Sequence, residues 1–156
     1  MSFIKIFNLY KEVGDIHREI KDEIKDLYLV DMKASELIYH IEHKILEKTK
    51  QKNIIGINNC LGFPIGISVN NCCAHWTISS KLDDIVFKEN DLVKIDFGIN
   101  NKGFIVDSAL TIATNKANDL HEQLNNASQE ALYSAIKMAR PDTIISEIGT
   151  QTHEII

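Results

Sequence analysis

The chain has 156 residues, of which 44% are hydrophobic and 25% charged, the balance of one globular domain. It contains no apolar run of about eighteen residues or more, so we predict no membrane span. The formal net charge is −5, and lysines alternate with acids, which argues against a nucleic-acid surface. The three cysteines are an odd number and two are adjacent, which favours a reducing compartment and predicts a cytoplasmic protein.

Apolar residues at helical spacing predict two helices near the start of the chain. The first covers about residues 8–28, and its buried stripe is predicted to be Ile16, Ile20, Ile24 and Leu27. The second covers about residues 35–49, with Ser35 as its predicted N-cap.

The composition changes after Lys52, where glycines and a proline stand among Ile and Val and predict short strands and turns. Leu92 to Phe97 and Phe104 to Ala113 are predicted to form the two strands of a hairpin. Further helices are predicted from Asp119 to about Met138 and from near Ser146. Helices followed by a small sheet and by helices again are typical of the α+β class.

A weak internal repeat relates the two ends of the chain. A shift of 111 positions places Gly14–Ile45 on Asn125–Ile156 without gaps and with more identities than chance provides. We interpret residues 1–156 as part of one domain, in which about 1–115 form a first unit and about 116–156 open a second. The strands expected after the second copy are absent, which predicts a truncated or split protein.

The predicted hairpin brings two aspartates to one face. A two-residue loop (Asn101-Lys102) and a four-residue loop (Asn100 to Gly103) impose the same register, in which Asp96 lies directly opposite Asp107. Side chains so placed have Cβ atoms roughly 4.5–5.5 Å apart. Two carboxylates at that separation repel by roughly 3 kcal/mol at an effective dielectric of about 20. Such a pair is expected to share a proton or to bind a cation.

We expect Gly98, beside Asp96, to leave room for a ligand, and two bridging carboxylates suit a pair of divalent metal ions. The alternative is a solvated hairpin in which the acids face water and Lys94 neutralises Asp96.

Several blocks of the sequence resemble type 2 methionine aminopeptidases. The segment from Phe63 to Thr77, FPIGISVNNCCAHWT, is similar to that family's FPTG…NNCxAHxT segment. The segments KIDFG (94–98) and IVDSALT (105–111) resemble the strands that carry the family's first two metal ligands. Residues 10–18 and 140–142 also match in place, so the resemblance covers nearly the whole chain.

The resemblance implies the pita-bread fold, with its first half and the opening helices of its second, pseudo-symmetric half. It also implies removal of the initiator methionine from nascent proteins by water that two divalent metal ions (Mn, Co, Fe or Zn) activate. Asp96 and Asp107 would be metal ligands. His75 would be a catalytic residue that also contacts the substrate, and Phe63 would line the methionine pocket. The substrate would be a peptide or nascent-chain N-terminus.

The family's other metal ligands, a histidine and two glutamates, belong to a second half that this chain lacks. We therefore expect the chain to be a poor catalyst alone, and a second chain or an oligomer to complete the site. Trp76 and Ile78 also depart from the tyrosine and proline common in the family.

Two other interpretations stay open. A non-catalytic aminopeptidase-like protein that docks at ribosomes would share Val69-Asn70-Asn71-Cys72 but would typically lose Asp107. A prolidase or aminopeptidase P would share the fold and the aspartate pair, but the Asn-Asn-Cys-x-Ala-His block argues against it.

Overall fold

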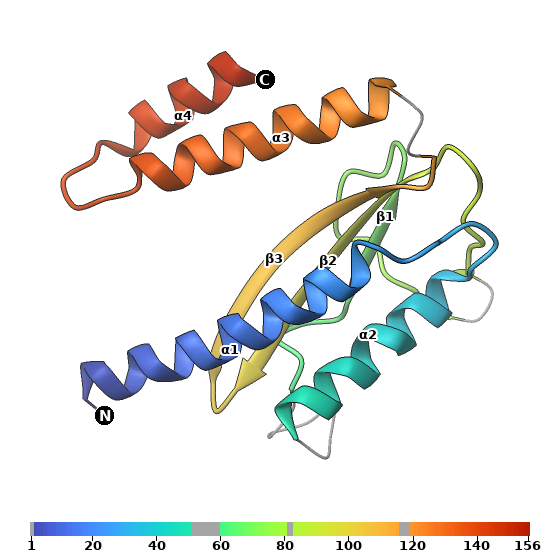
Figure 1. Cartoon of the computed structure of the whole chain (residues 1–156), viewed down its shortest axis with the longest axis horizontal. Coiled ribbons are helices and arrows are strands. Elements are labelled where there is room, and N and C mark those ends of the chain that lie inside the picture. Colours follow the sequence, from blue (N-terminus) through green and yellow to red (C-terminus); the bar gives the residue numbers. More distant parts are fainter. Residues whose placement is uncertain (1, 51–59, 81–82, 116–118) are drawn as a thin grey trace. The chain divides into compact units, whose positions relative to one another are not determined.

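The computed structural model describes residues 2–50, 60–80, 83–115 and 119–156. Two helices are followed by a three-stranded antiparallel sheet and by two further helices, in the order α1, α2, β1, β2, β3, α3, α4 (Figure 1). This order is the one predicted for the α+β class. The chain divides into two compact units, Met1–Thr114 and Asn115–Ile156.

Helix α1 spans Phe3–Ile24, so it begins earlier and ends earlier than predicted. Its buried side chains follow one stripe, because residues three or four apart share a helix face; they are Leu9, Val13, His17, Ile20 and Ile24. The first turns carry exposed apolar residues such as Phe3 and Ile4. The spacing of core residues therefore does not predict these turns as helical. Leu27 lies beyond the helix and packs against the core from the following turn.

Helix α2 spans Ala34–Thr49 and buries Ala34, Leu37, Ile41 and Ile45. The predicted N-cap was wrong, because Lys33 occupies that position. Ser35 lies in the first turn, where its backbone N–H and its hydroxyl donate hydrogen bonds of 3.1 and 2.7 Å to the carboxylate of Asp84. A remote carboxylate therefore satisfies groups at this helix start, where anions are favoured.

Strands β1 (Gly66–Val69), β2 (Leu92–Asn101) and β3 (Phe104–Ala113) form an antiparallel sheet in the order β1-β2-β3. Of the short strands predicted after Lys52, residues 51–59 lie outside the described part of the chain. Leu61 forms an isolated bridge with Ile99, and β1 follows it.

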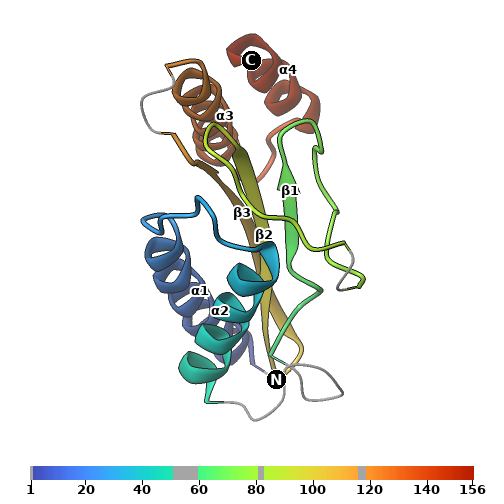
Figure 2. The same ribbon diagram turned by 90° about the vertical axis from the view of Figure 1, so that its right-hand side faces the viewer.

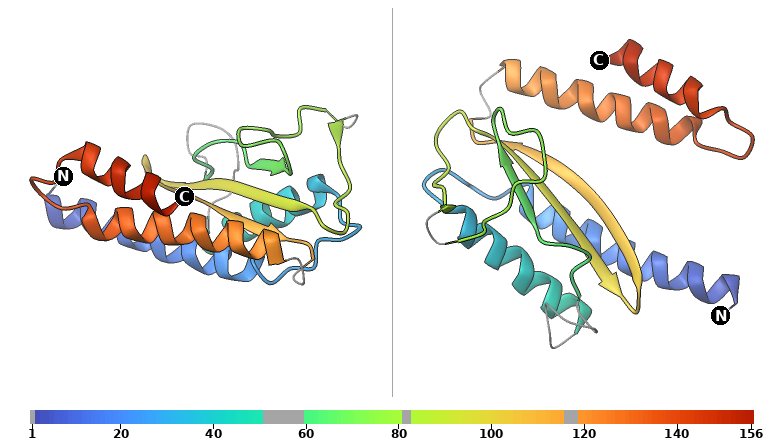
Figure 3. Two further views of the ribbon diagram at one scale, coloured as in Figure 1. Left: turned by 90° about the horizontal axis from the view of Figure 1, so that it is seen from above. Right: turned by 180° about the vertical axis from the view of Figure 1, so that it is seen from behind.

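Helices α1 and α2 lie side by side on one face of the sheet (Figure 2). Helix α1 crosses in front of the β2–β3 hairpin in Figure 1 and behind it in the opposite view (Figure 3, right). The core forms between these helices and one face of β2, from which Val93, Ile95, Phe97 and Ile99 enter it. Because strand side chains alternate, Lys94, Asp96 and Gly98 share the opposite face.

The hairpin turns at Lys102 and Gly103, and Asn101 pairs with Phe104. Both turn residues have positive φ, 55° and 87°, as a type I′ turn requires. The backbone N–H of Gly103 donates to Oδ1 of Asn100 at 3.0 Å. Neither predicted loop was right: the turn lies one residue further along than the predicted Asn101-Lys102 loop, and β2 continues beyond Phe97.

The second unit is a helical hairpin made of α3 (Asp119–Met138) and α4 (Ile145–Ile155), close to the predicted bounds. In the connection between them, the hydroxyl of Thr143 donates a 2.8 Å hydrogen bond to the carbonyl of Met138, the last residue of α3. Ala131 of α3 is buried, whereas larger apolar residues such as Leu132 and Ile136 are exposed within the described structure. In the part of the chain that the structure describes, no helix is long and apolar enough to cross a membrane.

Candidate metal centre and substrate site

The two aspartates lie diagonally across the hairpin. Asp96 pairs with Ala109, and Asp107 pairs with Gly98. The prediction that they are directly opposite was wrong, because the turn at Lys102 and Gly103 shifts β3 by two residues relative to β2. A shift of two residues preserves the face of every side chain. Both carboxylates therefore still lie on the side of the sheet away from α1 and α2.

Diagonal neighbours can approach closely at this position of the ladder. The carbonyl of Gly98 accepts a 2.8 Å hydrogen bond from the N–H of Gly62, so the peptide groups of Gly98 and Asp96 point toward β1. The pairs Gly98–Asp107 and Asp96–Ala109 are therefore non-hydrogen-bonded pairs of the β2–β3 ladder, in which side chains lie closer together. Diagonal Cβ atoms are then somewhat less than roughly 7–8 Å apart, which is close enough for the two carboxyl groups to bind the same cation.

The electrostatics of Asp96 show that the carboxyl groups interact. Burial, the negative charge of Asp107 and a hydrogen-bonding interaction with the Asp107 carboxyl raise the pKa of Asp96. His75 acts in the opposite direction and lowers the same pKa, as does His17 to a smaller extent. A carboxylate pair under this repulsion favours a cation between its members.

Small residues flank Asp96 on both neighbouring strands. Gly66 of β1 and Ala109 of β3 are its register partners. A Cβ added at Gly66 would lie 3.4 Å from the Cβ of Asp96. Even a methyl group at Gly66 would therefore be in van der Waals contact with the Asp96 side chain.

The space over Gly98 is occupied, contrary to the prediction that it would admit a ligand. A Cβ at Gly98 would lie 2.6 Å from Cε1 of Phe63, so the aromatic ring rests on the backbone of this glycine. Because Gly98 is the cross-strand partner of Asp107, Phe63 reaches the aspartate-bearing face. Glycine is needed here for the ring and not for a ligand.

His75 lies on a segment that runs beside β1. The N–H of Ile67 donates to the carbonyl of Trp76 at 2.8 Å, and the hydroxyl of Thr77 donates to the carbonyl of Ile65 at 2.8 Å. These bonds fix the residues after His75, which itself is exposed and has φ of 64°. A non-glycine residue in the left-handed region is uncommon and is enriched at functional positions.

Asn70 holds the turn between β1 and this segment. Its side chain donates to Asp91 at 2.8 Å and accepts from the N–H of Leu92 at 2.9 Å. The first asparagine of the Asn-Asn-Cys block therefore connects the end of β1 to the start of β2. Sequence reasoning did not assign this structural role.

Lys94 does not neutralise Asp96. Its ammonium group donates to the backbone carbonyl of Asn70 at 2.8 Å, and it is absent from the causes that shift the Asp96 pKa. The interpretation of a solvated hairpin in which Lys94 neutralises Asp96 is therefore not supported.

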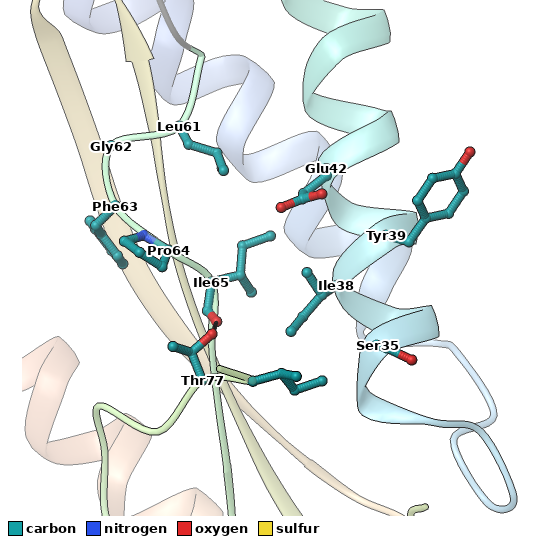
Figure 4. Close-up of a pocket in the computed structure, with 11 residues that line it drawn as sticks. Ser35, Ile38, Tyr39, Glu42, Leu61, Gly62, Phe63, Pro64, Ile65 and Thr77 are labelled. Atoms are coloured by element: carbon teal, nitrogen blue, oxygen red, sulfur yellow. Dashed lines mark hydrogen bonds between the residues drawn. The ribbon is translucent and has the colours of Figure 1, made fainter. Parts of the chain in front are cut away.

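A cavity of about 560 Å³ lies between α2 and the segment from Leu61 to Ile65, and Phe63 is one of its lining residues. In Figure 4 the Glu42 carboxylate points toward that segment, whereas the Tyr39 ring points away from it. Burial raises the pKa of Glu42. Asp96, Asp107 and His75 do not line this cavity. Phe63 therefore borders both this cavity and the aspartate-bearing face.

The donor set fits part of a metal centre. Two carboxylates that converge on one open face are ligands that hard divalent ions accept. Among the described residues, no group of three or more His, Cys, Asp or Glu side chains could hold a metal ion. Cys60, Cys72 and Cys73 are free thiols. If a metal ion binds here, the described residues would supply two carboxylate donors, Asp96 and Asp107, and other donors would fill the remaining coordination positions.

Known proteins resemble this chain in sequence and in fold. The model of metallopeptidase family M24 matches residues 8–156. The chain is 30% identical over 151 residues to methionine aminopeptidase 2A of Arabidopsis thaliana, with 97% of this chain and 33% of that protein covered. It is 31% identical over 154 residues to methionine aminopeptidase 2 of Saccharomyces cerevisiae, with 96% and 36% covered. The chain thus spans about a third of the length of these relatives.

The fold is that of solved peptidases. Proline aminopeptidase P II from Yersinia pestis superimposes with a TM-score of 0.78 at 18% identity, with 99% of this chain and 33% of that chain covered. The predicted pita-bread fold and the predicted resemblance to methionine aminopeptidases are confirmed. The chain belongs to metallopeptidase family M24.

Proposed function

We propose that this chain provides the aspartate half of a methionine aminopeptidase site, which removes N-terminal methionine from nascent proteins. The observation that carries the proposal is the convergence of Asp96 and Asp107 on the open face of the sheet, with His75 near enough to affect the pKa of Asp96. The relatives' names support methionine as the residue removed.

In this proposal each residue has a separate task. Asp96 and Asp107 hold divalent metal ions, which when bound activate water and polarise the scissile carbonyl. His75, exposed on its segment, donates a hydrogen bond to the peptide being cleaved or to its leaving amine. The Phe63 ring, resting on Gly98, forms an apolar wall for the methionine side chain.

Completion of the site requires further ligands. Two carboxylates leave most coordination positions to water, so we infer that a second polypeptide segment, in the same protein or in a partner, supplies the rest. The free cysteines support a reducing compartment such as the cytoplasm, where nascent chains and ribosomes occur.

Calorimetric titration with Mn²⁺ and Co²⁺, together with methionine release from a Met-Ala-Ser peptide, tests the proposal. We expect weak binding that is lost in Asp96→Asn and in Asp107→Asn. Asp15→Asn is the matched control, because Asp15 is an aspartate of α1 paired only with Arg18 among the contacts described. Equal binding by the wild type and by both site variants would refute the metal site.

The peptide assay then separates two roles. Turnover that depends on Asp96 would show that the chain or its oligomer completes the site. Metal binding without turnover would agree with a half-site. Absence of metal binding, combined with sedimentation of the chain with ribosomes, would favour the non-catalytic binding protein.

A further inference from the structure

Helix α1 makes polar contacts to both aspartate-bearing strands from the opposite side of the sheet. Nε2 of His17 lies 2.9 Å from the carbonyl oxygen of Phe97 on β2. Nζ of Lys21 lies 3.3 Å from Oγ of Ser108 on β3. His17 and Lys21 are four residues apart, so they share one face of the helix.

The two contacts meet the same rung of the ladder. Phe97 and Ser108 are direct register partners. Phe97 follows Asp96 in the chain, and Ser108 follows Asp107. This rung therefore lies between the Asp96–Ala109 and Gly98–Asp107 pairs, at the centre of the diagonal that separates the carboxylates.

His17 is an unexpected residue at its position. Its side chain is buried, and its ring stacks on Phe97 with a centroid distance of 4.2 Å and an interplanar angle of 4°. Burial lowers the pKa of His17, which favours the neutral imidazole. A carbonyl partner requires the proton on Nε2, which makes His17 the donor. An apolar side chain would fill the same space without the cost of burying a polar ring.

We propose that His17 and Lys21 are positioning residues, which clamp the Phe97–Ser108 rung and thereby set the separation of the Asp96 and Asp107 carboxylates. This inference rests on the proposed function, because the separation matters only if the pair binds a cation. Groups that orient metal ligands from outside the first coordination shell change affinity by about 10–100-fold when they are removed.

The test for His17 measures Mn²⁺ affinity of the full chain by the electron paramagnetic resonance signal of free Mn²⁺. We expect His17→Leu to weaken binding about tenfold, at the lower end of that range. His17→Gln retains a donor near the position of Nε2 and should restore most of the affinity. Val13→Ala is the matched control, since Val13 is also fully buried and lies one turn earlier on α1.

The test for Lys21 uses the direction in which Mn²⁺ affinity changes. Removing a positive charge should by itself tighten cation binding, so a weaker affinity in Lys21→Met at unchanged global stability indicates displaced carboxylates. Lys25→Met is the control, because Lys25 is exposed and pairs with Asp22 on the same helix. Weaker binding in Lys21→Met with unchanged or tighter binding in Lys25→Met is the expected result.

A metal-independent measurement separates this inference from the proposed function. Hydrogen exchange at the Ser108 amide should be faster in His17→Leu than in Val13→Ala at equal global stability. Equal exchange, or Mn²⁺ affinities that follow global stability alone, would overturn the clamp. If Asp96→Asn and Asp107→Asn leave Mn²⁺ binding unchanged, the proposed function fails even where the exchange result supports the clamp.

Discussion

The ring of Phe63 rests on Gly98, where a Cβ would stand 2.6 Å from Cε1. Gly98→Ala must therefore displace the ring or the strand, at a cost of about 1–3 kcal/mol of unfolding free energy. Gly14→Ala is a control of opposite sign, because nothing lies within 4 Å of a Cβ there. Alanine in a helix interior stabilises by about 0.5–1 kcal/mol. Chemical denaturation measures both, and recovery of Gly98→Ala stability by Phe63→Leu would confirm the contact.

Asp96→Asn should stabilise the metal-free chain at neutral pH. The folded-state pKa of Asp96 is raised, so its contribution to stability is full below the unfolded value of about 3.9 and is lost as pH rises through the folded value. Asparagine does not ionise, so Asp96→Asn avoids this loss of stability. The advantage of Asp96→Asn should therefore vanish at acidic pH, and each 1 kcal/mol of relief corresponds to about 2–4 °C in Tm.

Thermal unfolding in chelator across a pH series measures this advantage. Mn²⁺ should then raise the Tm of the wild type and leave that of Asp96→Asn unchanged. A variant less stable than wild type at pH 7 would contradict the repulsion.

Two substitutions in the hairpin turn should change the stability of the chain in opposite directions. Gly103 has φ of 87° and open space around it, so Gly103→Ala costs conformational strain alone, about 1–2 kcal/mol. Lys102 has φ of 55°, where asparagine is favoured over lysine. Lys102→Asn should therefore stabilise the chain slightly. Urea midpoints measure both changes, and a neutral Gly103→Ala would argue against the type I′ turn.

Ser35→Ala should lower stability in a pH-dependent way. The hydrogen bond from the Ser35 hydroxyl is the main cause that lowers the pKa of Asp84. This contribution to stability is present above the unfolded pKa and is lost as pH falls through the folded one. The difference between wild type and Ser35→Ala should thus be modest at pH 7 and shrink toward pH 3. Nonadditive effects of Ser35→Ala and Asp84→Ala in a double-mutant cycle would confirm the pair.

Which face each strand residue occupies could be predicted from the sequence, whereas the pairing across the hairpin could not. Alternation along β2 places Asp96 on one face and Phe97 on the other in any register that moves by two residues. The register itself depends on Lys102 adopting a positive φ, which lysine rarely does. The residue pattern gives no sign of that conformation.

Contacts between distant segments account for the other differences. The start of α2 depends on Asp84, which lies far along the chain from Ser35. The role of Gly98 depends on Phe63, and that of His17 depends on Phe97. Periodicity identifies the helices that carry Ser35 and His17, but Phe63 and Asp84 lie outside the helices and strands, and only the folded chain shows which atoms meet.

The diagonal relationship of Asp96 and Asp107 has a mechanical consequence. Directly opposed side chains keep nearly the same spacing when a ribbon coils, but diagonal ones move closer or further apart with its twist. Anything that winds or unwinds the β2–β3 ribbon, including a neighbour that packs on it, would change the distance between the two carboxylates. If the pair binds a cation as proposed, its affinity would depend on sheet coiling, and a binding partner would tune that affinity without touching either aspartate.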